Sequence, residues 1–401
     1  MTSPSLSLAR APASARPGPA GLPIPRISVI ICTLDEQEAI GGVLDDVQAA
    51  LGDVTHEIIV VDDSSNEHTA AVVRARASLA PNIRLIRRKG AVGLASAAID
   101  GWDAARGATL AIMDGDGQHD PQLMRRLLAR MDRGGFEVVI ASRYLNGGES
   151  GLGAMRDLMS RSATLVSGAM LGLRLADPLS GCFIMRREWY EMVRPSLSGL
   201  GFKILIDVVA SARRKPTICQ ISTALRPRAG GASKLDFRVI FDLAALLIDK
   251  RTRGVVPARM SQFLLVGLTG LALHLLVLAA AKLTGAHFWL AQGLAILTAM
   301  TWNFALNNSL TFRDRRLRGS AAWRGLLSFY GACLGGAVVS EASAAAVHAF
   351  GGAWALAGVF GALLGAFWNY GAARRLTWKL TDQPHRQAAV AVLSWLKGLR
   401  R

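Results

Sequence analysis

Up to about residue 253, the chain alternates short apolar runs with longer stretches of helical spacing. Five runs rich in β-branched residues predict buried strands, at 26–32, 57–61, 83–86, 108–113 and 137–142. Apolar residues at helical spacing predict helices between them, at 36–51, up to 79, at 93–105 and from Pro121. Strands that alternate with helices in this way predict an α/β domain built on a parallel, doubly wound sheet.

The remaining part of the chain is apolar in a different manner. Four stretches are long enough to span a bilayer, at about 261–283, 288–310, 325–349 and 353–373. Basic residues precede the first stretch, separate the second from the third and follow the fourth, whereas the other two loops are nearly uncharged. These basic residues are Arg251, Arg253 and Arg259, then Arg313, Arg315, Arg316, Arg318 and Arg324, and finally Arg374, Arg375 and Lys379. The pattern predicts a multi-pass protein of the cell membrane, with the α/β domain and both termini in the cytoplasm.

These patterns divide the chain into five parts. A leader rich in Ser, Ala, Pro and Gly at 1–25 is predicted to be disordered and has no signal-peptide core. The α/β domain follows at 26–235, an amphipathic interfacial segment at 236–258 and an all-α, four-helix transmembrane domain at 259–380. A basic amphipathic tail occupies 381–401. Both amphipathic segments suit an anionic membrane surface, although a solvated end is the alternative for the tail.

Composition narrows the class of protein. The 401 residues include 46 Lys and Arg against 29 Asp and Glu, a formal net charge of +17, yet 51% are hydrophobic and the mean hydropathy is +0.30. A basic and apolar chain is typical of a membrane protein, and a nucleic-acid partner is not expected because no aromatic and basic platform is present. The four cysteines form no C-x-x-C pair, which argues against a disulfide scaffold or a structural zinc site.

Acidic residues follow two of the predicted strands, where ligands of parallel α/β sheets bind. Asp114 and Asp116 flank Gly115 after the fourth strand, and two carboxylates on such a turn suit Mg²⁺ or Mn²⁺ holding a diphosphate. A plain turn is the alternative. Asp62 and Asp63 follow the second strand, where an acid accepts hydrogen bonds from a ribose or base, or caps the next helix. His119 is interpreted as a surface turn residue.

The motifs, taken in order, resemble glycosyltransferase family 2, and most closely its polyprenyl (dolichyl) phosphate mannosyltransferase branch. The resemblance covers about residues 27–234. Its motifs are Thr33-Leu34-Asp35-Glu36, Val61-Asp62-Asp63-Ser64, Gly93-Leu94-Ala95-Ser96-Ala97, Met113-Asp114-Gly115-Asp116-Gly117-Gln118-His119, Ser142-Arg143-Tyr144, Asp177-Pro178-Leu179-Ser180-Gly181-Cys182-Phe183, Gly201-Phe202-Lys203-Ile204, Arg226-Pro227-Arg228 and Gly230-Gly231-Ala232-Ser233-Lys234.

The transmembrane part resembles the GtrA-like family of four-helix membrane domains. The residues that carry this resemblance are Phe263-Leu264-Leu265-Val266-Gly267, Trp302-Asn303-Phe304, Asn307-Asn308 and Leu310-Thr311-Phe312. A second aromatic-Asn pair, Trp368-Asn369-Tyr370, predicts a pseudo-repeat of two-span halves. We expect Asn303, Asn307 and Asn369 to form hydrogen bonds between helices.

The resemblance implies a GT-A type (Rossmann-like) glycosyltransferase domain followed by an all-α transmembrane domain. It implies an inverting, membrane-bound enzyme that moves a hexose, first of all mannose from GDP-mannose, to a polyprenyl phosphate. The product would be a β-linked lipid-phosphate sugar, the cofactor Mg²⁺ or Mn²⁺, and the partners a nucleotide sugar, the lipid phosphate and the bilayer. Homo-oligomer formation stays open. The alternatives are UDP-glucose or another UDP-sugar as donor and, outside enzymes, a lipid-linked sugar flippase or scaffold.

The resemblance also implies roles for single residues. The nucleotide-sugar set is Cys32, Leu34, Glu36, Val61, Asp63, Gly115, Asp116 and Arg143. The acceptor-phosphate set is Arg156, Arg226, Ser233 and Lys234. The metal set is Asp114, Asp116 and Gln118, and the catalytic set is Asp114, Asp116, Arg143, Arg226 and Lys234. Four residues depart from the family pattern and leave the sugar nucleotide open, namely Cys32 for Pro, Asp35 for Asn, Gly115 for Ala and Asp207 for Glu.

Overall fold

Seven strands form one sheet, and the apolar runs of the sequence occupy its centre. The computed structural model describes residues 24–88, 93–145, 164–172, 174–201, 203–212, 214–226, 237–351 and 353–379. Within these residues the strand order is β3-β2-β1-β4-β6-β5-β7. The strands are β1 (Ile27–Thr33), β2 (His56–Asp62), β3 (Ile83–Arg87), β4 (Thr109–Asp114), β5 (Val138–Ser142), β6 (Phe183–Arg186) and β7 (Ile218–Ser222).

Strand β6 makes the sheet mixed, whereas the sequence predicts a parallel sheet. It lies between β4 and β5 and runs antiparallel to both, while the other strand pairs are parallel. The sequence pattern misses β6 because it has only four residues, and it misses β7 because Gln220 interrupts its short apolar run. The reversed direction of β6 brings the residues just before it, including Gly181, to the carboxyl end of β4.

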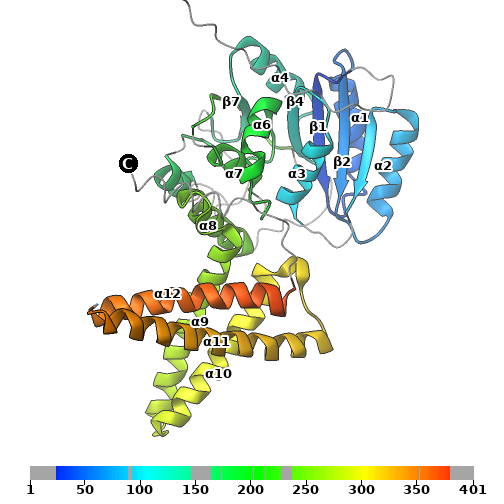
Figure 1. Cartoon of the computed structure of the whole chain (residues 1–401). Helices are drawn as coiled ribbons and strands as arrows, with labels where there is room; N and C mark the ends of the chain where they lie inside the picture. The colour runs from blue at the N-terminus through cyan, green and yellow to red at the C-terminus, as the bar shows by residue number, and fades with distance from the viewer. Residues whose placement is uncertain are drawn as a thin grey trace, which may run out of the picture.

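Helices bury both faces of the sheet. Ile27, Val29 and Ile31 of β1 pack in a core with α1 (Ile40–Ala50), α2 (His68–Leu79) and α4 (Leu123–Arg133). The opposite core lies beneath α3 (Leu94–Ala104), α6 (Arg187–Val193) and α7 (Ile204–Ala210) (Figure 1). Burial on both faces explains why these strands are continuously apolar rather than alternating.

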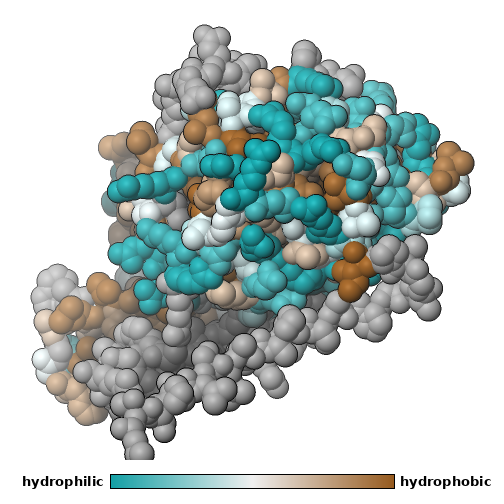
Figure 2. Space-filling model, turned by 90° about the horizontal axis from the view of Figure 1, so that it is seen from above, coloured by the Kyte–Doolittle hydropathy of each residue, from teal (hydrophilic) through white to brown (hydrophobic). Residues whose placement is uncertain are grey.

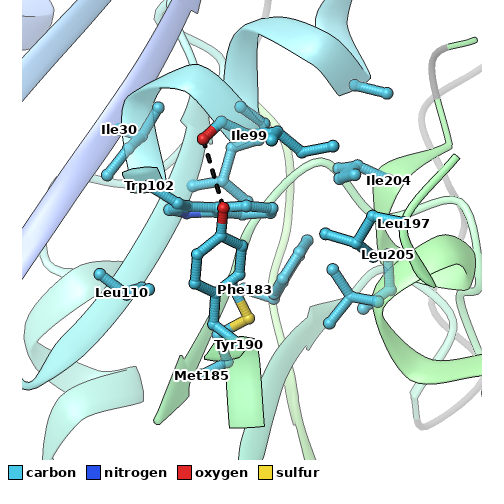
Figure 3. Close-up of a cluster of buried hydrophobic side chains, with 14 of the residues drawn as sticks. Ile30, Ile99, Trp102, Leu110, Phe183, Met185, Tyr190, Leu197, Ile204 and Leu205 are labelled. Carbon is cyan, nitrogen blue, oxygen red and sulfur yellow. Dashed lines mark hydrogen bonds between the residues drawn. The ribbon is translucent and has the colours of Figure 1, made fainter. Parts of the chain in front are cut away.

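Trp102 of α3 lies at the centre of the second core. Its ring centroid is 6.0 Å from that of Phe183 and 5.4 Å from that of Tyr190 (Figure 3). The indole Nε1 donates to the backbone oxygen of Ala111 in β4, so that the polar end of this buried ring is satisfied. Trp102 therefore joins α3 to the strand that carries the acidic turn.

The α/β domain is followed by a series of long helices. These are α8 (Phe237–Arg251), α9 (Ala258–Leu283), α10 (Phe288–Leu306), α11 (Ser320–Ala349) and α12 (Trp354–Ala372). Figure 1 shows α8 next to the α/β domain and the α11–α12 pair crossing the α9–α10 pair. Among the described residues, three segments are long and apolar enough to span a membrane, Ala258–Leu283, Ser320–Ala349 and Leu356–Thr377. The second predicted span coincides with α10, which has 19 residues and is not one of these three.

Surface polarity separates the two parts. Seen from the side away from the long helices, the α/β domain is mostly hydrophilic (Figure 2). The long helices instead expose large apolar side chains, such as Leu276 at 68%, Trp289 at 84% and Leu334 at 67%. Such exposure is expected of helices surrounded by lipid.

Helix α8, which the sequence predicts to lie at the membrane surface, packs against protein along part of its apolar side. Its Leu243, Leu246 and Leu247 are buried and pack with Ile206 of α7 and with Met170. Helix α8 also packs against α9. Protein therefore covers part of the apolar side of α8, whereas Ile240 is 48% exposed, and the membrane contact of this segment stays a prediction. The predicted basic tail at 381–401 lies outside the described residues.

The two halves of the membrane bundle repeat their contacts 66 residues apart. Gly270 of α9 lies against the side-chain amide of Asn303 on α10, and Gly336 of α11 lies against that of Asn369 on α12. A side chain at either glycine would collide with the amide. The Oδ1 atoms of both asparagines are buried and have no hydrogen-bond partner among the described residues. The interhelical hydrogen bonds predicted for these oxygens are thus replaced by close packing on glycine.

Aromatic side chains join the halves in an equivalent way. A π-helical turn ends each half, at Asn307–Thr311 (η3) and Ala373–Thr377 (η5), and the rings directly after them, Phe312 and Trp378, stack 4.2 Å apart. Phe263 contacts Tyr370 at 5.6 Å between ring centroids, and its counterpart Phe329 contacts Phe304 at 5.9 Å. This exchange of equivalent contacts agrees with the predicted pseudo-repeat.

Candidate active site

Three parallel strands bring the predicted acidic residues to one edge of the sheet. Thr33 at the end of β1 is in register with Asp62 of β2, and Cys32 is in register with Asp114 of β4. The acids after β2 and β4 therefore flank the carboxyl end of β1. This is the edge at which parallel α/β sheets bind ligands.

The turn after β4 folds one carboxylate inward and leaves the other at the surface. Asp116 is buried and its Oδ1 accepts a hydrogen bond from the backbone N–H of Gln118 at 3.1 Å. The Asp114 side chain is 38% exposed. Gly117 has φ of 75°, which permits the tight turn, and a Cβ at Gly115 would lie 2.9 Å from Thr33 Cγ2. Gly117 is therefore required for its backbone conformation, and Gly115 because a side chain there would collide with Thr33.

Arg226, predicted to bind the acceptor phosphate, lies beside this turn. Its backbone N–H donates to the carbonyl oxygen of Gln118 at 2.8 Å, and the Gln118 side-chain amide Nε2 donates to the Arg226 carbonyl at 3.1 Å. The Arg226 guanidinium is 3.6 Å from Asp120. The structure thus places the Arg226 backbone next to Gln118 of the predicted metal set and its guanidinium beside Asp120.

Arg143, at the end of β5, points into the same region from a paired position. Its Nε and Nη2 donate to the two carboxylate oxygens of Asp177 at 2.6 and 2.8 Å, and the Asp177 side chain is fully buried. Burial alone lowers the pKa of Arg143, but the pair with Asp177 outweighs it and raises the pKa. Arg143 therefore stays charged, with Asp177 fixing its direction.

Lys203 is a further cation of this region that our assignment of roles misses. Burial and the charge of Arg143 lower the pKa of Lys203, while Asp114 and Asp177 act in the opposite direction. Lys203 thus shares the electrostatic environment of the predicted catalytic residues. The only signal in the sequence is its place in the motif around Gly201.

Asp63, predicted to contact the nucleoside, is held by Arg88. The Arg88 Nε and Nη2 each donate to one Asp63 oxygen at 2.6 Å, and the Gly93 N–H donates to Oδ2 at 2.9 Å. Arg88 also donates to Ser96 and Asp100. The sequence analysis misses Arg88, which fixes Asp63 at the start of α3.

Asp62 has a structural role instead. Its Oδ1 accepts hydrogen bonds from Thr33 Oγ1 at 3.0 Å and from Ser64 Oγ at 2.6 Å. The same oxygen accepts from the Ser64 N–H at 3.2 Å. Asp62 thus organises the turn after β2.

The other predicted nucleotide-sugar residues surround the end of β1. Glu36 and Leu34 are half-buried, and the Glu36 backbone N–H donates to Thr69 Oγ1 at 3.1 Å. Cys32 is half-buried, and burial followed by the charges of Asp114 and Asp63 raises the pKa of its thiol, which stays protonated. Val61 is fully buried in the core beneath α3, so its side chain lies away from the edge.

His119 is not the surface turn residue that the sequence suggests. Its side chain is only 7% exposed, and Nε2 lies 3.6 Å from Asp114 Oδ2. Its Nδ1 is buried without a hydrogen-bond partner among the described residues. The turn folds back against α1, and Val43 and Val47 of that helix line a small cavity shared with His119.

Three predicted acceptor-phosphate residues, Arg156, Ser233 and Lys234, lie outside the described residues.

Comparison with known proteins identifies both parts of the chain. Residues 28–194 match the glycosyl transferase family 2 model, and residues 262–378 match the GtrA/DPMS transmembrane domain. The chain is 33% identical over 319 residues to a dolichol-phosphate mannosyltransferase of Pyrococcus furiosus, an alignment covering 79% of this chain and 88% of that protein. The chain belongs to glycosyltransferase family 2.

Other family 2 relatives carry related names. A polyprenol monophosphomannose synthase of Mycolicibacterium smegmatis is 31% identical over 53% of this chain and 82% of that protein. A dodecaprenyl-phosphate galacturonate synthase of Rhizobium johnstonii is 27% identical over 63% of this chain and 75% of that protein. Among solved structures, a glucosyl-3-phosphoglycerate synthase of Mycobacterium tuberculosis is similar at a TM-score of 0.44 and 21% identity, over 58% of this chain and 86% of that one.

As a family 2 glycosyltransferase, this enzyme shows how one departure from the family pattern, Asp35, is accommodated. Asp35 replaces Asn at a backbone φ of 58°, a left-handed conformation that Asp and Asn tolerate better than other side chains. The backbone N–H of Asp35 donates to Ser64 Oγ at 2.8 Å and its carboxylate accepts from Asn66. The turn after β1 is therefore maintained with Asp at position 35.

The GtrA/DPMS domain and the three apolar helices indicate a membrane protein.

Proposed function

We propose that this glycosyltransferase moves a hexose from a nucleotide sugar to a polyprenyl phosphate, with mannose from GDP-mannose as the donor. The observation that carries the proposal is the grouping of basic residues around the acidic turn: the Arg226 backbone bonds Gln118 of that turn, and the charge of Asp114 acts on Arg143 and Lys203. Apolar helices follow this domain directly, which suits a lipid acceptor. The named relatives, which include dolichol-phosphate and polyprenol-phosphate enzymes, support the acceptor class.

The charges suit a reaction between two anions. The second pKa of a phosphate monoester is about 6, so the acceptor is already a nucleophile near neutral pH and needs no strong general base. What it needs is compensation for the repulsion between its phosphate and the diphosphate of the donor. Arg143, Lys203 and Arg226 supply fixed positive charge where that repulsion is greatest.

The oxygen atoms of the acidic turn fit a Mg²⁺ or Mn²⁺ ion. The Asp116 and Asp114 carboxylates and the Gln118 amide offer the hard ligands that these ions prefer. In the part of the chain that the structure describes, no three His, Cys, Asp or Glu side chains gather as a complete metal site. Diphosphate and water oxygens would complete the shell. A bound ion would stabilise the charge of the departing nucleotide.

A single displacement by the acceptor phosphate inverts the anomeric carbon. An α-linked donor such as GDP-mannose then yields a β-linked lipid-phosphate sugar. Arg143 and Lys203 hold the diphosphate, and Arg226 meets the incoming phosphate. The basic residues around Arg251, Arg259 and Arg313 support a cytoplasmic active site by the positive-inside rule.

A transfer assay with the full-length protein tests this proposal. Purified protein in detergent, with dolichyl or undecaprenyl phosphate, is given radiolabelled GDP-mannose or UDP-glucose, with Mg²⁺, Mn²⁺ or EDTA. We expect labelled lipid from GDP-mannose only, loss of product with EDTA, and a β anomer by NMR. Label from UDP-glucose instead supports the UDP-sugar alternative. Detergent has no two leaflets, so product formed there also excludes a flippase with an inactive α/β domain.

A further inference from the structure

A buried polar cluster joins the membrane helices to the α/β domain. Asp242 of α8 is 6% exposed, and its Oδ1 accepts a hydrogen bond from Gln262 Nε2 of α9 at 2.7 Å. Arg313, just after α10, donates to the Asp242 Oδ2 at 2.9 Å. A carboxylate buried in this manner depends on such partners, since an unpaired buried charge is costly. Two membrane segments therefore fix the position of one side chain on α8.

Asp242 also supports the backbone that leads into the active site. Gly201 has φ of 79°, and a Cβ there would lie 3.0 Å from Asp242 Cβ and 3.2 Å from its Oδ2. The Gly201 carbonyl oxygen accepts a hydrogen bond from the backbone N–H of Ala95, at the start of α3. Lys203 comes two residues after Gly201 and is the N-cap residue of α7. The backbone of Gly201 is thus held between Asp242 on one side and α3 on the other.

We propose that Asp242 is a positioning residue for glycosyl transfer: the membrane helices, acting through Asp242, hold the Gly201 backbone and thereby aim Lys203 at the donor diphosphate. The inference rests on the proposed function, because it assigns to Lys203 a phosphate-binding role in that reaction. It gives the membrane domain a part in forming the active site, in addition to anchoring the enzyme.

A second cluster keeps α8 docked independently of Asp242. Lys250, near the end of α8, lies 2.6 Å from Asp207 of α7 and 3.2 Å from Asp249, and it donates to the Ser196 carbonyl at 2.8 Å. Asp207 also accepts hydrogen bonds from Ser198. Because this cluster is two turns away along α8, a change at Asp242 alters the support of Gly201 without releasing the helix.

The test compares two neighbouring ion pairs of the full-length enzyme. Asp242→Asn removes the charge that Arg313 and Gln262 hold. The control, Asp314→Asn, breaks the 3.1 Å pair of Asp314 with Arg259, which lies in the membrane domain. We expect Asp242→Asn to raise the KM for the nucleotide sugar and to weaken binding of the nucleoside diphosphate about 3- to 30-fold. Binding of the free nucleoside, which lacks phosphate, and both constants of Asp314→Asn stay at the wild-type value.

A double-mutant cycle separates positioning from general damage. In a Lys203→Met background, Asp242→Asn is expected to have no further effect on diphosphate binding, because the side chain it positions is gone. Arg313→Lys, which keeps the charge, is expected to stay close to wild type, and Arg313→Gln to resemble Asp242→Asn. Arg313→Gln also serves if Asp242→Asn does not fold, since Asp242 then keeps Gln262.

Two results overturn the inference. One is a donor KM in Asp242→Asn and Arg313→Gln no different from that in Asp314→Asn. The other is full additivity of Asp242→Asn with Lys203→Met. Failure of the proposed function is recognised separately, as absence of transfer by the wild-type enzyme. The cycle on diphosphate binding can then still be measured.

Discussion

Asp177 in the α/β domain and Asn303 in the membrane helices are both polar groups in a packed interior, but the protein accommodates them differently. Asp177 accepts two hydrogen bonds from Arg143, so that its charge is directly compensated. Asn303 Oδ1 has no hydrogen-bond partner among the described residues and lies against Gly270. The α/β domain balances charge, whereas the membrane domain relies on close contact between small and polar residues.

The difference follows from the surroundings of each region. A buried charge is destabilising unless it is paired, and at this edge of the sheet Asp63 is paired with Arg88 and Asp177 with Arg143. Lipid offers no hydrophobic force between helices, so small residues that allow close approach become decisive. Substitutions should therefore act through charge in the first region and through volume in the second.

The largest effect is expected at the acidic turn. Asp116→Ala removes a buried carboxylate of the predicted metal set, and we expect transfer to fall by roughly a thousandfold or more. The melting temperature should change little because Asp116 is at the edge of the sheet. Initial rates with radiolabelled donor measure the loss. Asp132→Ala, which breaks a surface pair with Arg26, is the matched control, and equal rates in the two variants would contradict the assignment.

The next effect concerns a charge pair. Arg143→Leu leaves Asp177 buried and unpaired, and we expect the free energy of unfolding to fall by about 3–5 kcal/mol. Replacing Asp177 by Leu as well should restore much of the stability, since no isolated charge remains, while activity stays lost. Thermal unfolding in detergent and the transfer rate together measure both parts. A double variant as unstable as Arg143→Leu would show that charge is not the cause.

A smaller effect, of steric origin, is expected in the membrane domain. Gly336→Ala forces a methyl group against Asn369 and should destabilise the bundle by about 1–3 kcal/mol. Gly331→Ala on the same helix meets nothing within 4 Å and is the control. Thermal unfolding in detergent distinguishes them. Equal melting temperatures would mean that the helices separate without cost, and the contrast with the α/β domain would fail.

The smallest effect is a pH dependence. Because burial and Arg143 lower the pKa of Lys203, its charge is lost at a lower pH than that of an ordinary lysine. Donor kcat/KM should therefore fall as the pH rises toward the ordinary lysine value of about 10.4, before an ordinary lysine would lose its charge, and Lys203→Arg should retain its value over that range. The pH profiles of the two enzymes measure this directly. Parallel profiles would place the titration on another group.

The sequence predicts those parts of the fold whose signals are local. The first five strands are short runs rich in β-branched and apolar residues, and the acidic turn follows from its place at the end of β4. Strand β6 is invisible because four residues carry no period, and its position between β4 and β5 depends on distant partners. The same holds for α8, whose amphipathic pattern does not reveal whether lipid or protein covers its apolar side.

The candidate site divides along the same line. Asp114, Asp116 and Asp63 are recognisable from motifs, because their chemistry and their strand ends are adjacent in sequence. Arg88 is not, since its place in the site depends on the ion pair with Asp63, which follows another strand, and Lys203 is marked only by its place in the motif around Gly201. An isolated arginine or lysine in a basic chain gives no sign of such a partner.

The bundle consists of two similar hairpins in one polypeptide, so that equivalent positions of the two hairpins can carry different residues. Gln262 and Arg313 donate hydrogen bonds to Asp242. The equivalent residues of the second hairpin, 66 positions later, are Ser328 and Lys379. Ser328 instead shares a hydrogen bond with Thr377 inside its own half. The first hairpin thus contacts α8 through Asp242, whereas Ser328 of the second hairpin makes its contact within the bundle.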